Sequence, residues 1–339
     1  MTGGRVLVAR LDNQGDVLLA GPAVRAVAAR ASHVVLLCGP RGRAAADLLP
    51  GVDEVLEWCA PWIDPEPEPV KVAHVDALVE AVRGRGVDEA VLLASYHQSS
   101  LPLALLLRLA GVRRITAVSE DYPGSLLDVR HRIDDDLPEV ERALSTATAA
   151  GYPRPPDDDG RLAVRRPLPD VSGLVGAGGY VVVHPGASVP ARAWSPGRCA
   201  QTVEALAARG DRVVVTGGRD ETDLTARVAG RHGLDLGGRT TFVEVAAVLA
   251  GAAATVVGNT GPAHLAAAVG TPVVSLFAPT VPAVRWAPYG VPVALLGDQH
   301  APCRDTRARV CPVPGHPCLD SVTPADVLAA LDALVGVAA

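Results

Sequence analysis

The 339-residue sequence is poor in aromatic side chains, at 3% of its residues, and lysine occurs once, at position 71. A low aromatic content disfavours a surface on which nucleic-acid bases stack. The net charge of −6 also disfavours the basic surface that nucleic-acid-binding proteins present. We therefore expect no nucleic-acid partner, and a cation at a ligand site should be an arginine, whose hydrogen-bond geometry differs from that of lysine.

The sequence also lacks long apolar runs. No stretch reaches the ~18 residues of a membrane span, and the opening MTGGRVLVARLDNQGD lacks the charged and apolar regions of a signal peptide. These absences predict a cytoplasmic protein without a transmembrane segment, for which a peripheral membrane contact stays open. The six cysteines are too few for a disulfide framework in this chain, and we expect free thiols.

Short runs of Val, Ile and Leu alternate with amphipathic segments rich in Ala, Leu and Arg in both halves of the chain. This alternation is typical of β-α-β units around a buried parallel sheet. Residues 151–179 are rich in Pro, Gly and Asp and are interpreted as a connector, the alternative being a long surface loop of one domain. The sequence thus predicts an α/β fold with two Rossmann-like, doubly wound parallel-sheet domains facing a cleft, and ligands at the carboxyl ends of the strands.

The predicted domains are residues 1–150 and 180–323, followed by a helical segment at 324–339. Strands are predicted at 6–9, 33–37, 54–56, 90–94, 114–117, 180–184, 212–216, 234–236, 254–257, 273–277 and 292–295. Helices are predicted at 17–29, 41–48, 75–83, 101–109, 137–149, 195–208, 221–231, 242–250, 262–269 and 324–337.

The first of four notable strand-to-helix turns is RLDNQGDVLLAG. Gly15 permits a tight turn, and Asp16 lies at the predicted start of a helix. Asp16 has two interpretations: it caps the helix by accepting backbone N–H bonds, or its carboxylate acts as a general base. The turn contains neither G-x-G-x-x-G nor G-x-x-x-x-G-K-[ST], so neither a standard dinucleotide site nor a P-loop is predicted.

The second and third turns are VVVHPGASVPARAWSP and VVVTGGRDETDLTARV. In the second, Gly186 allows a ligand to approach the backbone, Ser188 offers a hydroxyl and Arg192 a cation suited to phosphate. In the third, the carboxylate of Glu221 either interacts favourably with the helix dipole at the N-terminus or contacts a ribose.

The fourth turn is GNTGPAHLAAAVGT. Gly261 begins a helix whose first N–H groups can bind an anion, and the hydroxyl of Thr260 can bind the same anion. His264 falls in the first turn of this helix and faces either the anion or the core. Together with an arginine, such a turn suggests a diphosphate site, and the separate carboxylate of Asp16 suggests a base that acts on a hydroxyl.

These turns resemble glycosyltransferase family 9, the ADP-heptose:lipopolysaccharide heptosyltransferases. The matching segments are RLDNQGDVLLAGPAVRAV, VVVHPGASVPARAWSPGRCA, VVVTGGRDE and GNTGPAHLAAAVGTPVVSLFAPT, in order over nearly the full length. The resemblance implies the GT-B fold, an acceptor-binding first domain, a nucleotide-sugar-binding second domain, and transfer with inversion and without a metal. This fold also implies that the last helix crosses back to the first domain.

The resemblance assigns roles to particular residues. Asp16 matches the catalytic base, Arg192 stands where the family usually has a lysine near the donor phosphates, and Glu221 falls near the acid that helps to bind the nucleoside. Thr260, Gly261 and His264 match the turn that contacts the diphosphate.

Besides the arginine at position 192, two features set this chain apart from the family pattern. Asn259 replaces an acid that helps to recognise the donor sugar, and we count it as a donor-site residue while leaving the sugar open. Residues 119–132, SEDYPGSLLDVRHR, differ from the lipopolysaccharide enzymes and are expected to shape the acceptor side, together with Gly15, His97 and Gln98.

The predicted function is transfer of heptose or a related hexose from a nucleotide-diphosphate sugar, expected to be ADP-linked, to an acceptor hydroxyl. The acceptor is a glycan, a lipid-linked molecule or a small molecule, and no cofactor is expected beyond the nucleotide-sugar co-substrate. The alternatives are a non-catalytic nucleotide-binding partner of another glycosyltransferase and a sugar-nucleotide epimerase on the same fold.

The segment APCRDTRARVCPVPGHPCLD holds Cys303, Cys311, His316 and Cys318, which at first suggest a zinc site. Structural zinc sites usually contain C-x₂₋₄-C pairs, which are missing here. Four prolines favour an ordered irregular loop. We therefore expect buried or loop-packing thiols and no metal.

Overall fold

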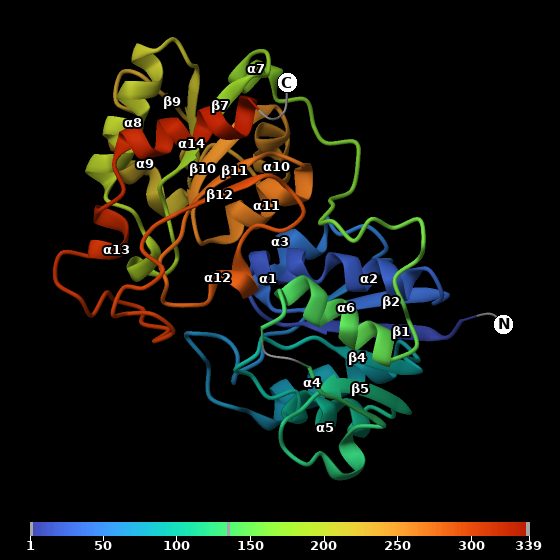
Figure 1. Ribbon diagram of the computed structural model, residues 1–339. Coiled ribbons are helices and arrows are strands. Elements are labelled where there is room, and N and C mark those ends of the chain that lie inside the picture. Colours follow the sequence, from blue (N-terminus) through green and yellow to red (C-terminus); the bar gives the residue numbers. More distant parts are fainter. Residues whose placement is uncertain (1–2, 134–135, 337–339) are drawn as a thin grey trace. The chain divides into compact units, whose positions relative to one another are not determined.

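The computed structural model describes residues 3–133 and 136–336, and the contacts divide the chain into two compact units, Met1–Arg165 and Arg166–Ala339. In the part of the chain that is described, each unit is built around a six-stranded sheet flanked by helices (Figure 1). All described strand pairs are parallel, as the alternating pattern of the sequence predicts.

The first sheet has the strand order β3-β2-β1-β4-β5-β6. Its strands are β1 (Arg5–Arg10), β2 (His33–Cys38), β3 (Glu54–Glu57), β4 (Glu89–Leu92), β5 (Arg114–Val118) and β6 (Val129–His131). Its helices are α1 (Gln14–Leu19), α2 (Gly21–Ala28), α3 (Arg43–Ala46), α4 (Val72–Arg83), α5 (Leu101–Leu109) and α6 (Glu139–Ala149), with short 3-10 turns η1 (Pro40–Gly42) and η2 (Gly124–Leu126). Because side chains alternate along a strand, Leu7 and Ala9 of β1 pack with α4 and α5, while α1, α2 and α6 lie on the opposite side of the sheet (Figure 1).

The second sheet has the strand order β12-β11-β10-β7-β8-β9. Its strands are β7 (Tyr180–His184), β8 (Val213–Val215), β9 (Leu234–Asp235), β10 (Ala252–Gly258), β11 (Val273–Leu276) and β12 (Val293–Leu296). Its helices are α7 (Ser172–Val175), α8 (Pro196–Ala208), α9 (Thr222–Ala229), α10 (Phe242–Ala250), α11 (Gly261–Val269), α12 (Ala283–Trp286), α13 (Pro317–Asp320) and α14 (Pro324–Gly336), with 3-10 turns η3 (Pro190–Arg192) and η4 (Arg219–Glu221).

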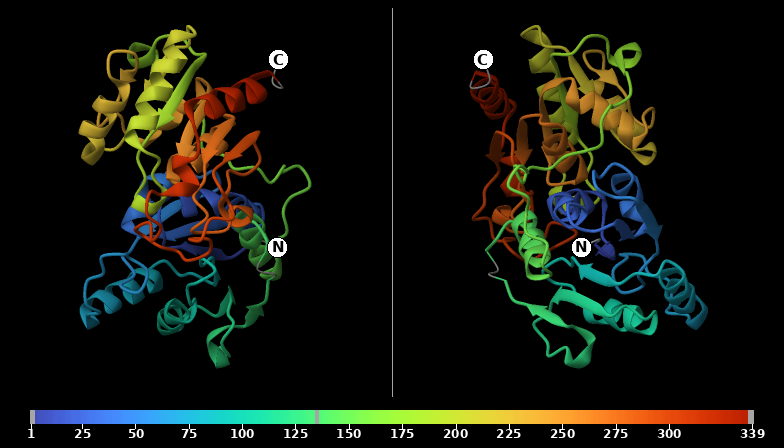
Figure 2. Two further views of the ribbon diagram at one scale, coloured as in Figure 1. Left: turned by 60° about the vertical axis from the view of Figure 1, so that its left-hand side comes forward. Right: turned by 90° about the vertical axis from the view of Figure 1, so that its right-hand side faces the viewer.

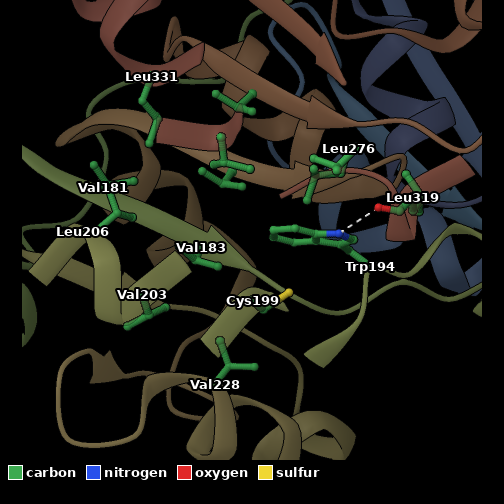
Figure 3. Packing of buried hydrophobic residues seen from close by; sticks show 14 of the residues in the cluster. Val181, Val183, Trp194, Cys199, Val203, Leu206, Val228, Leu276, Leu319 and Leu331 are labelled. Carbon is green, nitrogen blue, oxygen red and sulfur yellow. Dashed lines mark hydrogen bonds between the residues drawn. The ribbon is translucent and has the colours of Figure 1, made fainter. Parts of the chain in front are cut away.

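The core of the second unit lies between its sheet and helices α8, α9 and α14. Val181 and Val183 of β7 point toward Val203 of α8 in this core (Figure 3). The indole of Trp194, which precedes α8, donates a hydrogen bond of 3.1 Å to the carbonyl oxygen of Leu319 (Figure 3). This bond satisfies the polar edge of a buried aromatic ring, and it ties α13 to the segment that precedes α8.

The last helix packs in the core of the second unit. Val327, Leu331 and Leu334 recur at helical spacing and are buried in the core of the second unit. Helix α14 contacts α8 and strands β10, β11 and β12, and it lies beside this sheet in both views of Figure 2. It therefore belongs to the second unit, where its apolar stripe is buried against the sheet. A crossing of this segment to the first domain stays a prediction.

The predicted connector is divided between the two units at Arg165. The guanidinium of Arg25 in α2 binds both carboxylate oxygens of Asp158, at 2.6 and 2.8 Å. The backbone N–H of Arg165 donates to the carbonyl oxygen of Leu48 at 2.8 Å. The first half of this Pro- and Asp-rich segment is therefore fastened to the first unit, and a short helix, α7, occurs in the second half.

The predicted strands agree with the structure to within two residues, but β6 was missed. It has three half-buried residues, Val129, Arg130 and His131, at the edge of the first sheet, and so it lacks a buried apolar run. The helix predicted at 17–29 is divided into α1 and α2, with Pro22 in the first turn of α2. No helix in the described residues is both long enough and apolar enough to span a membrane.

Candidate functional site

Both sheets have a topological switch point, the place where ligands commonly bind in doubly wound folds. In the first sheet β1 lies between β2 and β4, and in the second sheet β7 lies between β8 and β10. The loops that follow β1 and β4 therefore flank one candidate site, and the loops that follow β7 and β10 flank another. Each site is described within its own unit.

The first site is a buried polar cluster around Arg10, the last residue of β1. One terminal nitrogen, Nη2, lies 2.9 Å from Asp12 Oδ2 and 3.1 Å from Asp16 Oδ1, and it donates to Ser95 Oγ at 2.7 Å. The other, Nη1, lies 3.3 Å from Glu139 Oε2. One arginine thus holds three carboxylates, which come from the loop after β1, from α1 and from α6.

Asp16 is the member of this cluster that solvent reaches. Its side chain is 20% exposed, whereas the side chains of Arg10, Asp12 and Glu139 are 3%, 6% and 1% exposed. Asp16 accepts the hydrogen bond from Arg10 Nη2 through its Oδ1 atom. Asp16 can therefore meet a substrate while its partners hold it in place.

The electrostatics of the cluster favour a proton on Asp16. Burial and the neighbouring carboxylates of Asp12 and Glu139 raise its pKa to about 6, against the opposing effect of Arg10. Burial alone would lower the pKa of Arg10, but the three carboxylates outweigh it and raise that pKa, so the guanidinium stays charged. A carboxylate with a pKa near the working pH has the property that general-base catalysis requires.

The structure separates the two interpretations of Asp16. Helix α1 begins at Gln14, its N-cap residue is Asn13, and Asp16 is its third residue. The carboxylate of Asp16 accepts a hydrogen bond from Arg10, and the side chain of the N-cap residue Asn13 makes no capping bond. The helix-cap interpretation is therefore not supported. Gly15 is buried in the same helix between Gln14 and Asp16.

Gln98 connects the cluster with a cavity in the first unit. Its Nε2 donates to Asp12 Oδ1 at 2.6 Å, and its Oε1 accepts from the backbone N–H of Ser95 at 3.1 Å. The cavity has a volume of about 580 Å³. It is lined by Tyr96, His97, Gln98, Ser99, Val118, Ser119, Glu120, Asp121, His131, Arg132, Ile133 and Arg142. The predicted acceptor-side residues His97 and Gln98 therefore share a cavity wall with much of the 119–132 segment.

In the second unit, Gly186 and Glu221 come together after β7 and β8. A Cβ atom on Gly186 would lie 1.9 Å from Glu221 Oε1, so this approach requires glycine. Glu221 Oε2 accepts the backbone N–H of Gly218 at 2.7 Å, which places the carboxylate at the start of η4. Glu221 thus supports the local turn and lies at the carboxyl ends of two strands. Ser188 is exposed in the loop after Gly186.

The N-terminus of α11 is built as the sequence predicts, with Gly261 as its first residue and Thr260 as N-cap. The Thr260 hydroxyl makes no capping bond. The N–H of Ala263 already donates to the Thr260 carbonyl at 3.0 Å, and Pro262 has no N–H. The backbone donor that this end can offer to a ligand is therefore the N–H of Gly261, with the Thr260 hydroxyl beside it.

Two buried polar side chains accompany this helix end. Asn259 is 5% exposed and His264 is 4% exposed, and within the described residues Asn259 Nδ2 and His264 Nδ1 have no hydrogen-bond partner. Burial, together with the positive charge of Arg192, lowers the pKa of His264 to about 4. His264 is thus neutral at pH 7, and Arg192 lies close enough to influence it. Buried polar atoms are normally satisfied, so these atoms fit a ligand-binding position.

The cysteine loop is packed without an evident metal site. Cys303 and Cys318 are buried in the core of the second unit. Cys311 Sγ lies 3.3 Å from the Val313 carbonyl oxygen, and His316 Nε2 lies 3.1 Å from the Ala191 carbonyl oxygen. Across residues 3–133 and 136–336, no three His, Cys, Asp or Glu side chains are grouped as metal ligands. The expected absence of a metal remains a prediction.

Sequence reasoning missed four members of the first cluster: Arg10, Asp12, Ser95 and Glu139. Arg10, Asp12 and Ser95 follow the predicted strands β1 and β4 closely, so the switch-point rule could have found them. Glu139 lies 129 residues from Arg10 and follows no strand end directly. The local sequence contains no signal for its contact with the cluster.

Comparisons with known proteins agree with this architecture. The family model described as glycosyltransferase family 9 (heptosyltransferase) matches residues 76–316. A curated relative, lipopolysaccharide heptosyltransferase 3 of Escherichia coli, is 34% identical over 165 residues, which are 46% of this chain and 47% of the relative. The chain thus matches about half the length of that relative.

Solved structures support the same fold over nearly the whole chain. A family 9 glycosyltransferase from Veillonella parvula DSM 2008 has a TM-score of 0.77 at 16% identity and covers 98% of this chain and 97% of its own. The E. coli heptosyltransferase WaaC with ADP-2-deoxy-2-fluoro heptose has a TM-score of 0.72 at 23% identity and covers 97% and 99%. Because the family model matches more than half of the chain, the chain belongs to glycosyltransferase family 9.

Proposed function

We propose that the protein transfers a sugar from an ADP-linked donor, heptose or a related hexose, to an acceptor hydroxyl with inversion at the anomeric carbon and without a metal. The observation that carries this proposal is the position of Asp16. Its carboxylate is the solvent-reached member of a buried charged cluster, and its pKa is raised to about 6. Above that pH it can accept the proton of a hydroxyl group.

The proposed reaction is a single displacement. The acceptor oxygen attacks the anomeric carbon of the donor while Asp16 takes the hydroxyl proton. The bond between the anomeric carbon and the diphosphate oxygen breaks, and its electron pair leaves with the nucleoside diphosphate. Attack from the face opposite the leaving group inverts the anomeric centre.

Support for the donor site comes from the second unit. Arg192 supplies a cation, the N–H of Gly261 and the Thr260 hydroxyl supply hydrogen-bond donors, and Asn259 has an unsatisfied buried amide. Fixed donors of this kind stabilise the negative charge that develops on a leaving diphosphate. The similarity to WaaC, whose structure contains ADP-2-deoxy-2-fluoro heptose, favours an ADP-linked sugar.

Support for the acceptor site comes from the first unit. The 580 Å³ cavity has histidine, arginine, carboxylate and amide groups in its wall. Such a lining suits an acceptor with several hydroxyl groups, because each polar group needs a hydrogen-bond partner. Gln98 links this wall through Asp12 and Arg10 to Asp16, so we assign the acceptor to this cavity.

The test uses the purified full chain. Calorimetry with ADP, UDP, GDP and dTDP should show preferred binding of ADP, and release of ADP from ADP-heptose should be measured with a panel of glycans, lipid-linked sugars and small hydroxylated acceptors. We expect transfer that persists in EDTA and a product whose anomeric configuration, determined by NMR, is inverted. A retained configuration would refute the displacement mechanism, and failure to bind any nucleotide would refute the donor site.

A matched pair of variants connects the activity with Asp16. Asp16→Asn should remove most of the turnover while leaving ADP affinity unchanged. Asp76→Asn, which changes an exposed aspartate of α4, should leave both unchanged. Turnover that both variants retain would assign the base to another residue.

A further inference from the structure

One charge in the first cluster has no part in the proposed chemistry. Glu139 is the first residue of α6, and its side chain is 1% exposed. Its Oε2 contacts Arg10 Nη1 at 3.3 Å, and its Oε1 has no hydrogen-bond partner among the described residues. Burying a carboxylate with an unsatisfied oxygen is unfavourable unless another interaction compensates, so this position calls for an explanation.

Arg10 alone would make Asp16 a weak base. An arginine within a few ångströms of a carboxylate stabilises the charged form and lowers the pKa by about 1–3 units. Asp16 Oδ1 lies 3.1 Å from Arg10 Nη2. With this pair alone, the carboxylate would be ionised at neutral pH but would bind a proton too weakly for efficient transfer.

Glu139 changes this balance in two ways. It occupies Nη1 of Arg10, which leaves Nη2 to contact Asp12, Asp16 and Ser95. It also adds a negative charge, so the three carboxylates together outnumber the single guanidinium. Glu139 stands in the first turn of α6, where the helix dipole is positive and a carboxylate is favourably placed.

We propose that Glu139 is a positioning residue for the transfer reaction: it orients Arg10 and offsets its positive charge, so that Asp16 stays basic enough to take the acceptor proton. This inference rests on the function proposed above. Glu139 itself needs no contact with donor or acceptor, and it acts through Arg10.

The charges around α1 are compatible with this role. The helices and turns that contact α1 are α2, α3, α6 and η1. Outside the cluster, these elements carry charged side chains that form ion pairs: Arg25 with Asp158, Arg41 with Asp64 and Glu66, and Arg43 with Asp47 and Glu57. Arg142 of α6 lies 4.0 Å from Glu139 Oε1. Burial has the largest effect on the pKa of Asp16, followed by the charges of Asp12, Arg10 and Glu139. Glu139 is thus the residue of α6 whose negative charge raises the pKa of Asp16.

The experiment is the pH dependence of kcat/KM for Glu139→Gln, with ADP-heptose and the acceptor on which the wild type is active. The glutamine keeps the shape and removes the charge, so the acid limb should move to lower pH by about 0.5–1 unit, and kcat on the alkaline plateau should fall. Glu139→Asp, which keeps the charge, should hold the acid limb near its wild-type position. Glu141→Gln on the same helix should leave the profile unchanged.

The outcomes separate this inference from the proposed function. If Asp16→Asn is inactive but Glu139→Gln has a wild-type acid limb, the inference is wrong and the proposed function stands. If Asp16→Asn is fully active, the proposed function itself fails. An equal shift in Glu139→Gln and Glu139→Asp, or a Glu139→Gln chain that does not fold, would assign Glu139 a packing role and overturn the inference.

Discussion

Asp16→Asn should make the protein more stable at alkaline pH while it removes catalysis. The folded-state pKa of Asp16 is about 6, against an ordinary value of 3.8. A raised acid pKa means that the folded chain binds the proton more tightly than the unfolded chain. The contribution of Asp16 to stability is therefore most favourable below about pH 4, declines as the pH rises to about 6, and stays unfavourable above that.

The size of this effect follows from the shift. Two pKa units correspond to about 3 kcal/mol at 1.36 kcal/mol per unit, and coupling to the other carboxylates makes about 1–3 kcal/mol the working range. Asparagine has no charge to bury, so the variant should regain this free energy at pH 8 and gain little at pH 4. For a unit of this size the melting temperature at pH 8 should rise by roughly 2–10 °C.

The assay is thermal unfolding of wild type and Asp16→Asn at pH 4 and pH 8, combined with turnover at pH 8. Turnover should fall by about 10²–10⁴-fold, the usual contribution of a general base. A variant that melts lower than wild type at pH 8 would refute the charge balance derived for the cluster. If Asp16→Asn is more stable than wild type but keeps full turnover, the charge balance of the cluster is correct and Asp16 is not the general base.

Three further predictions concern the second unit. Gly186→Ala should displace the Glu221 carboxylate, because the new Cβ meets Oε1. The loss of its hydrogen bond from Gly218 should lower the free energy of unfolding by about 0.5–1.5 kcal/mol in denaturant titration, and a more stable variant would contradict this geometry. Arg192→Ala should weaken ADP binding in calorimetry by about 10–100-fold through loss of a charge-assisted hydrogen bond. Arg227→Ala, which changes an exposed arginine, should leave the Kd unchanged. A wild-type Kd for Arg192→Ala would mean that the diphosphate binds elsewhere. Elemental analysis of untagged protein should find no stoichiometric metal; one equivalent of zinc or iron, lost together with folding in Cys311→Ser, would show a metal site.

The fold was predictable because the strands are buried on both sides. Strands such as β2 and β7 appear in the sequence as continuous apolar runs, which local patterns detect well. Strand β6 has only three half-buried residues, so its place depends on pairing with β5, which the sequence alone does not reveal. The packing partner of α14 could not be predicted from the sequence either, because an apolar stripe on a helix predicts burial but not the surface that covers it.

The candidate site was predictable where turn chemistry is local. Asp16 and Gly261 stand at strand-to-helix turns, and their residue types indicate a base and an anion site. Glu139 belongs to the same cluster as Asp16, yet it enters through a helix far along the chain. A contact between distant segments depends on how α6 packs, so the charge balance around Asp16 emerges only in three dimensions.

An arginine at the proposed donor site has a different alkaline working range from that of a lysine. A lysine at position 192 would begin to lose its charge near pH 10, whereas a guanidinium stays protonated beyond pH 12. His264 is already neutral above about pH 4, Asp16 is ionised above about pH 6, and Arg10 keeps its charge. Asp16, His264 and Arg10 should therefore keep one charge state between pH 7 and pH 10, and we expect a broad alkaline plateau of activity in place of a bell-shaped optimum.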